Sequence, residues 1–315
     1  MMHFSLSLLT VLMIAAQARA EVNYTRQKDV IYGRSFGTSL TMDVITPKAN
    51  ANGIGVIWVV SGGWFSSPDA ITPQTIEMFG GEMTRRGYTI FAVCHESAPY
   101  FTIRGAVNDL NRSVRFIRSH AKDYNIDPDR IGIYGGSAGG HLSLMQATAP
   151  QPPNEKSPDP VERTPSTVQA AAVFFPPTDF LNYGKEGAIA WEVPELAPFR
   201  ASFDFRDIDE KTKMFERVPR EKKIEISRQL SPLYHVTPDD APALLIHGDA
   251  DFLVPIQQAK AIIEKYEAAK VPAKLVTKPG KGHGWPEMTQ DAKTIADWFD
   301  EHLKNKSTTK PSSSP

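Results

Sequence analysis

Residues 130–141 read Arg-Ile-Gly-Ile-Tyr-Gly-Gly-Ser-Ala-Gly-Gly-His, and this stretch decides the fold of the chain. It places Ser137 at the centre of a G-x-S-x-G pattern, after a short apolar run and before a helix-forming run that begins at His141. A strand, a sharp turn and a helix in this order form a nucleophile elbow, which exposes the serine hydroxyl at the end of a sheet. The flanking glycines lack Cβ atoms, so strand and helix can approach each other closely. The pattern predicts a nucleophile at Ser137, against the alternative of an ordinary glycine-rich turn.

A nucleophilic serine needs a general base, and on this layout the base is a histidine late in the chain. His283 lies between two glycines, directly after a strand predicted over residues 273–278. An imidazole titrates near neutrality, as general-base work requires. We therefore expect His283 to act on Ser137.

The acid that orients this histidine should come between the serine and the histidine in chain order. Asp251 is favoured, because it lies in the loop after a buried strand predicted over residues 243–248. Asp249, two residues earlier, is the reserve, with capping of the turn as its other role. Asp179, after an earlier strand, is a third candidate. The residues alone leave these alternatives open.

An oxyanion needs N–H donors that are already in place. One donor is expected from Ala138, the residue after the nucleophile, and the second from the loop after the strand predicted over residues 54–60. That loop reads Ser-Gly-Gly-Trp over residues 61–64, and its glycines allow the backbone amides to point inward. Gly63 and Trp64 are the predicted source, against the alternative of a plain Gly-Gly turn.

The alternation of strands and helices predicts an α/β fold with a mostly parallel, doubly wound sheet and helices on both faces. From the third strand onward the strands are near-continuous apolar runs, as expected where both faces are covered. Catalytic loops then belong at the carboxyl ends of the strands. The eight predicted strands are 25–32, 38–46, 54–60, 88–94, 130–135, 170–175, 243–248 and 273–278.

Two stretches interrupt the alternation. The proline-rich residues 149–168 predict a surface excursion, and residues 181–230 predict an insert that forms a cap over the active site, with a peripheral helical decoration as the alternative. Trp64 and Trp285 stand beside predicted catalytic residues, so both are expected to contact substrate.

These motifs resemble the α/β-hydrolases of the esterase/lipase superfamily over residues 28–303. Within it, the chain is similar to acetyl-esterase and feruloyl- or acetylxylan-esterase-like enzymes and to the catalytic domain of prolyl oligopeptidases. The resemblance implies Ser137 as nucleophile, Asp251 as acid and His283 as base. Many relatives carry His-Gly-Gly-Gly where this chain has Ser-Gly-Gly-Trp at 61–64. A second departure is the run Cys-His-Glu-Ser-Ala-Pro at 94–99, where relatives often have a Tyr-Arg-Leu-Ala-Pro-like run.

The resemblance implies a serine hydrolase that acts on carboxylic esters, with a short acyl chain or with an acyl group linked to carbohydrate. The substrate is expected to be a small molecule or an ester attached to a polysaccharide. A prolyl oligopeptidase-like peptidase and a non-catalytic hydrolase-fold binding protein are the alternatives. An acyltransferase would share the same acyl-enzyme. No metal spacing appears and no cofactor is expected. The oligomeric state stays open.

The composition and the two terminal segments of the sequence give further predictions about binding partners, location and domain bounds. The 315 residues include 35 Lys and Arg against 36 Asp and Glu, a net charge of −1, which argues against electrostatic binding of nucleic acid or a membrane surface. Residues 1–20 predict a signal peptide cleaved after Ala20, hence a secreted or periplasmic protein with no stable membrane insertion. The catalytic domain is expected over 21–304 and a disordered tail over 305–315. The only cysteine, Cys94, cannot form an internal disulfide.

Overall fold

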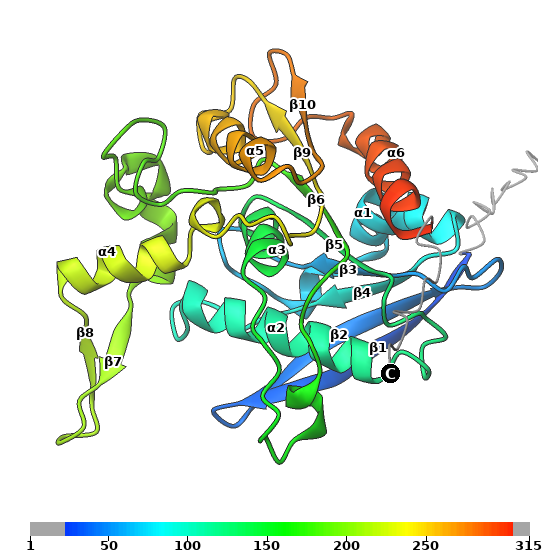
Figure 1. Ribbon diagram of the computed structural model, residues 1–315, viewed down its shortest axis with the longest axis horizontal. Helices are drawn as coiled ribbons and strands as arrows, with labels where there is room; N and C mark the ends of the chain where they lie inside the picture. Colours follow the sequence, from blue (N-terminus) through cyan, green and yellow to red (C-terminus); the bar gives the residue numbers. More distant parts are fainter. Residues whose placement is uncertain (1–22, 305–315) are drawn as a thin grey trace, which may run out of the picture.

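The computed structural model describes residues 23–304, so the predicted signal peptide and the predicted tail lie outside the described residues. Its centre is an eight-stranded sheet in the order β1-β2-β4-β3-β5-β6-β9-β10 (Figure 1). The first two strands run antiparallel to their neighbours and the others are parallel. This confirms the predicted fold class. The strands are β1 (Tyr24–Ser35), β2 (Thr38–Pro47), β3 (Gly55–Val59), β4 (Thr89–Val93), β5 (Ile131–Gly136), β6 (Ala170–Phe174), β9 (Ala243–Gly248) and β10 (Ala273–Lys278).

Helices cover both faces of the sheet (Figure 1). The central strands are buried on both sides, because successive residues enter different cores. In β3, Ile57 and Val59 lie in the core on one face of the sheet, whereas Val56 and Trp58 lie in the core on the other face. This explains why these strands read as unbroken apolar runs. The helices are α1 (Pro73–Arg85), α2 (Ile103–Ser119), α3 (Ala138–Thr148), α4 (Arg220–Gln229), α5 (Gln257–Ala269) and α6 (Met288–Phe299), the last continued by a π-helical turn (Asp300–Lys304).

The loops that carry the predicted catalytic residues lie at one edge of the sheet. The parallel strands β3, β4, β5, β6, β9 and β10 all end there. Because β2 is antiparallel to β4, with Met42 opposite Val93, the turn between β1 and β2 lies at this same edge. In Figure 1 the edge is on the left-hand side. Segments that are distant in sequence are therefore neighbours here.

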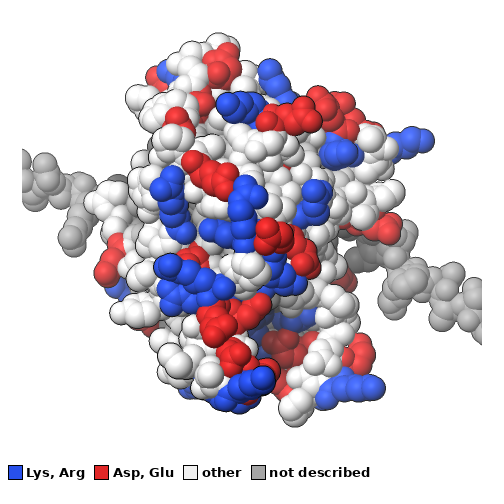
Figure 2. Space-filling view, turned by 90° about the vertical axis from the view of Figure 1, so that its left-hand side faces the viewer, with Lys and Arg blue, Asp and Glu red and all other residues white. Residues whose placement is uncertain are grey.

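The insert at 181–230 lies beside this edge. It contains two 3₁₀ segments (Ala190–Glu192 and Pro194–Phe203), the hairpin of β7 (Arg206–Ile208) and β8 (Phe215–Arg217), and α4. The hairpin projects from the left of the molecule in Figure 1 and was not predicted. Figure 2 views that side and shows basic and acidic side chains interleaved, with no large area of one sign.

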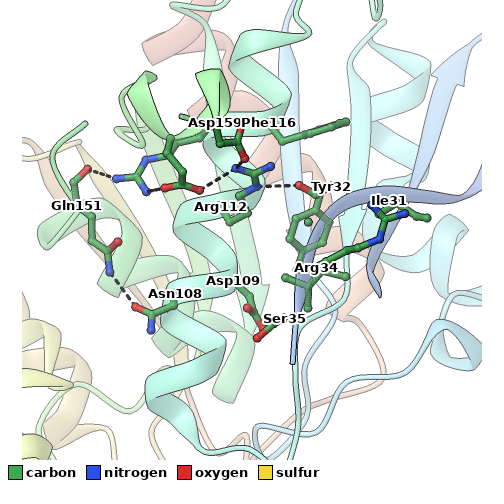
Figure 3. Close-up of a pocket in the computed structure, with 14 residues that line it drawn as sticks. Ile31, Tyr32, Arg34, Ser35, Asn108, Asp109, Arg112, Phe116, Gln151 and Asp159 are labelled. Carbon is green, nitrogen blue, oxygen red and sulfur yellow. Dashed lines mark hydrogen bonds and ion pairs between the residues drawn. The ribbon is translucent and has the colours of Figure 1, made fainter. Parts of the chain in front are cut away.

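The proline-rich segment 149–168 is held on the surface of α2 by arginines (Figure 3). Arg112 forms ion pairs with Asp159 at 2.6 Å and Glu162 at 2.8 Å. Arg115 pairs with Glu162 at 2.6 Å and donates to the carbonyl of Gln151. These contacts close one side of a polar cavity of about 550 Å³ between β1 and α2. The segment is thus a surface excursion with a fixed position. No helix within residues 23–304 has the length and apolar character that a membrane span needs.

Candidate active site

Ser137 occupies the turn between β5 and α3 in a strained conformation, with φ 55° and ψ −120°. An L-residue rarely adopts a positive φ, and such strain is typical of functional sites. The neighbouring glycines allow it. A Cβ on Gly135 would lie 2.7 Å from the Gly139 backbone, and a Cβ on Gly139 would lie 2.8 Å from the carbonyl oxygen of Val59. Neither position has room for a side chain, so the elbow can close only with glycine there.

Three predicted residues meet at this elbow. The Ser137 hydroxyl lies 3.0 Å from Nε2 of His283, although the two are 146 positions apart in the chain. On the other side of the ring, Nδ1 of His283 lies 2.7 Å from Oδ2 of Asp251. Because a carboxylate only accepts, Nδ1 carries the proton and Nε2 is left to accept from the serine. This is the arrangement that a general base needs.

His283 is held at the tip of a tight turn. The Gly284 amide donates to the Gly282 carbonyl at 3.0 Å, and Gly284 has φ 105°, a conformation that favours glycine. The ring of Phe175 lies against the imidazole, with centroids 4.3 Å apart. Phe175 itself has φ 35°. Sequence reasoning missed this residue, and its position directly after β6, at the carboxyl edge, is the signal that could have found it.

The Asp251 carboxylate is buried and accepts several hydrogen bonds. Its Oδ1 accepts from the amides of Leu253 and Val254, both at 2.9 Å. Nε2 of His247, a fully buried histidine, lies 3.4 Å from Oδ2. Burial opposes ionisation, but the contacts with His247, His283 and the Val254 amide outweigh it and hold the pKa of Asp251 well below its usual range. The carboxylate thus stays charged beside His283.

The two other acid candidates face elsewhere. Asp249 accepts from the Gly280 amide at 2.6 Å and so ties the β9 loop to the β10 loop. Asp179 accepts from the Leu181 amide at 2.8 Å and from the Tyr234 hydroxyl at 3.0 Å. Of the three candidates, the structure brings only Asp251 into contact with His283.

The loop after β3 is a four-residue turn with free amides at its centre. The amides of Gly62 and Phe65 each donate to the other residue's carbonyl, both at 3.0 Å. Between them Gly63 has φ 59° and Trp64 has φ 64°, which defines a type I′ turn. The Gly63 and Trp64 amides have no acceptor within residues 23–304, and the amide of Ala138 is the first of α3. The Gly63 and Trp64 amides thus have no internal partner in the described residues, and a role of these three amides toward an oxyanion at Ser137 stays a prediction.

The ring of Trp64 does not reach the site, contrary to the prediction that it contacts substrate. Its Nε1 donates to Nδ1 of His141 at 3.1 Å, and the residue is only 3% exposed. The ring is packed edge-on against Phe180 and Phe203. An indole N–H needs a partner when buried, and His141 supplies it. The ring anchors the turn instead.

Trp285 is also turned inward. Its Nε1 donates to Asp291 at 2.7 Å, and the residue is 8% exposed. The ring packs against Phe174 and Phe175. Neither Trp64 nor Trp285 lines the pocket at Ser137. The structure therefore does not place either ring where the predicted contact with substrate requires it.

The pocket beside Ser137 has a volume of about 280 Å³. Its walls are largely apolar and aromatic, with Phe65, Phe79 and Phe175 among them. Phe79 is stacked on the buried Trp58 with a centroid distance of 5.3 Å and forms part of the pocket wall. Pockets for drug-sized ligands begin near ~300 Å³, so this one suits a small apolar group.

The hydroxyl of Ser61, the first residue of the loop, is held by another buried histidine. The Ser61 hydroxyl lies 2.8 Å from Nε2 of His95, whose Nδ1 lies 2.6 Å from the Glu96 carbonyl oxygen. A carbonyl only accepts, so Nδ1 is protonated and Nε2 accepts from Ser61. Burial lowers the pKa of His95 to about 4, which keeps this ring neutral at neutral pH. Segments 61–64 and 94–99, the two that differ from the usual sequence of the similar family, are thus joined by the hydrogen bond between Ser61 and His95.

The insert touches this loop from the side. A Cβ on Gly63 would overlap the ring of Phe199, and the Ser202 hydroxyl donates to the Gly63 carbonyl at 3.3 Å. No residue of 181–230 lines the pocket at Ser137. A cap that closes over Ser137 stays a prediction.

Curated relatives of the chain are named ester hydrolases. A probable carboxylic ester hydrolase, LipM of Mycobacterium tuberculosis (strain ATCC 25618 / H37Rv), is 26% identical over 266 residues, which cover 84% of this chain and 57% of that protein. Esterase LipC of the same organism is 25% identical over 277 residues, with 86% and 62% covered. The chain thus spans about three fifths of the length of these relatives.

Solved structures agree on the fold. A truncated form of a carbohydrate esterase from gut microbiota is 27% identical, with a TM-score of 0.71 over 90% of this chain and 99% of that one. An acetyl ester-xyloside bifunctional hydrolase from Caldicellulosiruptor lactoaceticus is 19% identical, with a TM-score of 0.68 over 87% and 95%. The second likeness supports the fold alone.

A protein-family model also covers most of the domain. The BD-FAE model matches residues 42–266, from β2 through the elbow and the Asp251 loop into α5. With its α/β-hydrolase sheet and nucleophile elbow, the chain belongs to the BD-FAE family.

Proposed function

We propose that this protein is a serine esterase in which Ser137 is the nucleophile, His283 the base and Asp251 the acid. The observation that carries the proposal is the continuous contact from the Ser137 hydroxyl to His283 at 3.0 Å and on to Asp251 at 2.7 Å. In a strained elbow at the edge of a pocket, this arrangement favours attack on a carbonyl carbon.

The proposed reaction has two halves, acylation of Ser137 and hydrolysis of the acyl-enzyme. Nε2 of His283 takes the Ser137 proton while the serine oxygen bonds to the ester carbonyl carbon. The amides of Ala138, Gly63 and Trp64 stabilise the resulting oxyanion. When it collapses, the alcohol leaves with the proton from His283, and the acyl group stays on Ser137. Water then attacks the acyl-enzyme, His283 takes a proton from the water and returns it to Ser137, and the carboxylic acid leaves.

Short acyl groups, including acyl groups linked to carbohydrate, are the substrates we propose. The small aromatic-walled pocket of about 280 Å³ supports a short acyl chain or a small aromatic acyl group. The name of the 27% identical structural relative, a carbohydrate esterase, supports a sugar on the alcohol side. We further propose a secreted or periplasmic location, based on the apolar run from Phe4 to Ala16 and the A-x-A cleavage pattern that ends at Ala20.

Hydrolysis of p-nitrophenyl acetate, butyrate and octanoate tests the activity. Ser137→Ala is compared with Ser119→Ala, which removes an exposed hydroxyl on the outer surface of α2. We expect Ser137→Ala to lose at least ~10³ in kcat and Ser119→Ala to match the wild type. Equal slow rates in all three proteins would overturn the proposal in favour of a binding protein. Cleavage of peptides without cleavage of esters would favour the peptidase alternative.

A further inference from the structure

A second hollow of about 450 Å³ opens at the same edge of the sheet as Ser137. Aromatic side chains line it, and three of them are far more exposed than aromatic residues usually are: Phe36 is 83% exposed, Tyr100 91% and Phe215 63%. Phe101 completes the set, with its ring 6.1 Å from that of Phe36. We call this hollow the aromatic groove and define it by these four residues.

Three segments that are distant in sequence build the aromatic groove. Phe36 lies in the turn between β1 and β2, Tyr100 and Phe101 lie in the loop before α2, and Phe215 begins strand β8 of the hairpin. In Figure 1 the β1–β2 turn and the hairpin lie at the lower left, on either side of the start of α2. Exposed aromatic rings provide flat apolar surfaces on which a ligand can pack.

The polar groups of the aromatic groove are balanced in charge. Arg104 pairs with Asp207 at 3.1 Å, and Arg206 pairs with Asp204. Arg104, Arg206 and Asp204 line the groove together with Glu96, so two cations face two anions there. Figure 2, which views this side, shows the same mixture of signs. A highly charged ligand of either sign has little to gain here, whereas a neutral ligand rich in hydroxyl groups meets both donors and acceptors.

The aromatic groove and the pocket at Ser137 are separate hollows that lie near each other along the same edge of the sheet. A smaller hollow of about 200 Å³ shares Glu96 and Phe101 with the groove and is also lined by Ser66 and Pro68. Phe65 and Ser67, the neighbours of Ser66, line the catalytic pocket. The path between the two hollows follows the carboxyl edge of the sheet from β5 past β3 and β4 to β2. Three strand spacings of ~4.8 Å make it roughly 15 Å long.

We propose that the aromatic groove binds the neutral sugar chain of an acylated oligosaccharide whose ester lies at Ser137. A sugar ring has one face of C–H groups, which packs on aromatic rings, and hydroxyl groups at its rim, which can reach Arg104, Arg206 and Asp204. The inference rests on the proposed esterase function and adds the site that holds the alcohol part of the substrate. Only a chain of several sugar units spans both the ester position and the groove.

The test compares esters whose alcohol is short or long. We measure kcat/KM for acetylated xylo-oligosaccharides of two and six sugar units and for p-nitrophenyl acetate. The wild type should prefer the six-unit ester. Tyr100→Ala and Phe215→Ala should each lower kcat/KM for the six-unit ester about tenfold, mainly through KM, and leave the two smaller esters unchanged. Met214→Ala is the matched control, because Met214 is 67% exposed in the same hairpin but does not line the groove.

Binding without turnover provides an independent readout. Calorimetry of the Ser137→Ala protein with xylohexaose should show binding that the additional substitution Tyr100→Ala weakens about tenfold. Absence of binding, together with equal kcat/KM for short and long esters in all variants, would overturn the groove while leaving the esterase function intact. A wild-type dimer that Tyr100→Ala dissociates, with no sugar binding, would also overturn it. Failure of every ester, small ones included, would instead contradict the proposed function.

Discussion

Nε1 of Trp64 donates a hydrogen bond to Nδ1 of His141 across 3.1 Å, and this contact ties the turn after β3 to the helix after β5. The turn carries the Gly63 and Trp64 amides, and the helix begins at Ala138. His141 is itself fixed, because its Nε2 lies 2.7 Å from the carbonyl oxygen of Leu230. Burial lowers the pKa of His141 to about 4, so the ring is neutral and can accept from Trp64. The two segments predicted to supply the oxyanion donors are thus held in one buried network.

Trp64→Phe should therefore weaken both activity and stability. It leaves Nδ1 of His141 buried without a donor, which costs ~1–3 kcal/mol of unfolding free energy, and it loosens the turn that holds two amides. We expect kcat on p-nitrophenyl acetate to fall about tenfold or more. Trp298→Phe is the matched control, since the buried Nε1 of Trp298 has no hydrogen-bond partner in the described part of the chain. Equal losses in both variants would show that only packing is involved.

Gly63→Ala should abolish most of the activity. The position has φ 59°, and a Cβ there would overlap the ring of Phe199. Loss of one correctly placed oxyanion donor costs ~10² or more in kcat. Gly187→Ala separates this effect from backbone strain, because Gly187 has φ 72° with open space around it. The explanation fails if both variants lose stability alike and Gly63→Ala keeps the wild-type kcat.

Asp251→Asn should lower kcat by ~10³–10⁴ with little change in KM, because the amide cannot hold His283 in the correct tautomer. Asp249→Asn keeps an oxygen for the Gly280 amide and should stay within about tenfold of the wild type. Steady-state kinetics on p-nitrophenyl acetate measures both. A larger loss in Asp249→Asn than in Asp251→Asn would reassign the acid.

Phe79→Ala should deepen the pocket and change the preferred acyl length. Phe79 is stacked on Trp58 at the pocket wall, and each buried methylene is worth ~0.8 kcal/mol. The ratio of octanoate to acetate hydrolysis should rise about tenfold. Phe116→Ala, which removes a ring stacked on His120 on the outside of α2, should leave the ratio as it is. An unchanged ratio in Phe79→Ala would mean that the acyl group lies elsewhere.

Asp109 should make the protein less stable as the pH rises. Burial, with a smaller contribution from the nearby Glu96 carboxylate, raises the pKa of Asp109 to about 7. An unfolded aspartic acid releases its proton near pH ~3.9, so between pH ~4 and 7 the folded state binds the extra proton and the free energy of unfolding falls. Above pH 7 this contribution is fully lost.

Asp109→Asn should flatten that slope and gain ~1–3 kcal/mol over the wild type at pH 8, while keeping an acceptor for the Glu96 amide. Urea unfolding at pH 5 and pH 8 measures the difference. Asp123→Asn, at an exposed position in the turn after α2, is the control. The same pH dependence in Asp109→Asn and the wild type would contradict the assignment.

Much of the fold could be predicted because its signals are local. The eight strands of the sheet lie within about two or three residues of their predicted bounds, since apolar runs and turn residues mark each one. The β7–β8 hairpin escaped, because its strands of three residues each are exposed and carry no alternating pattern. The strained turn at Ser137 followed from the glycines around it.

What the sequence determined by itself is the order of strands and helices, the elbow at Ser137 and the loops that hold His283 and the acid candidates, because each depends on neighbours along the chain. The tertiary structure decided which carboxylate faces His283, turned the ring of Trp64 inward to His141, and brought Phe36, Tyr100 and Phe215 around one groove. These outcomes depend on how loops from different strands pack at one edge of the sheet. Local sequence patterns do not predict such contacts between distant segments.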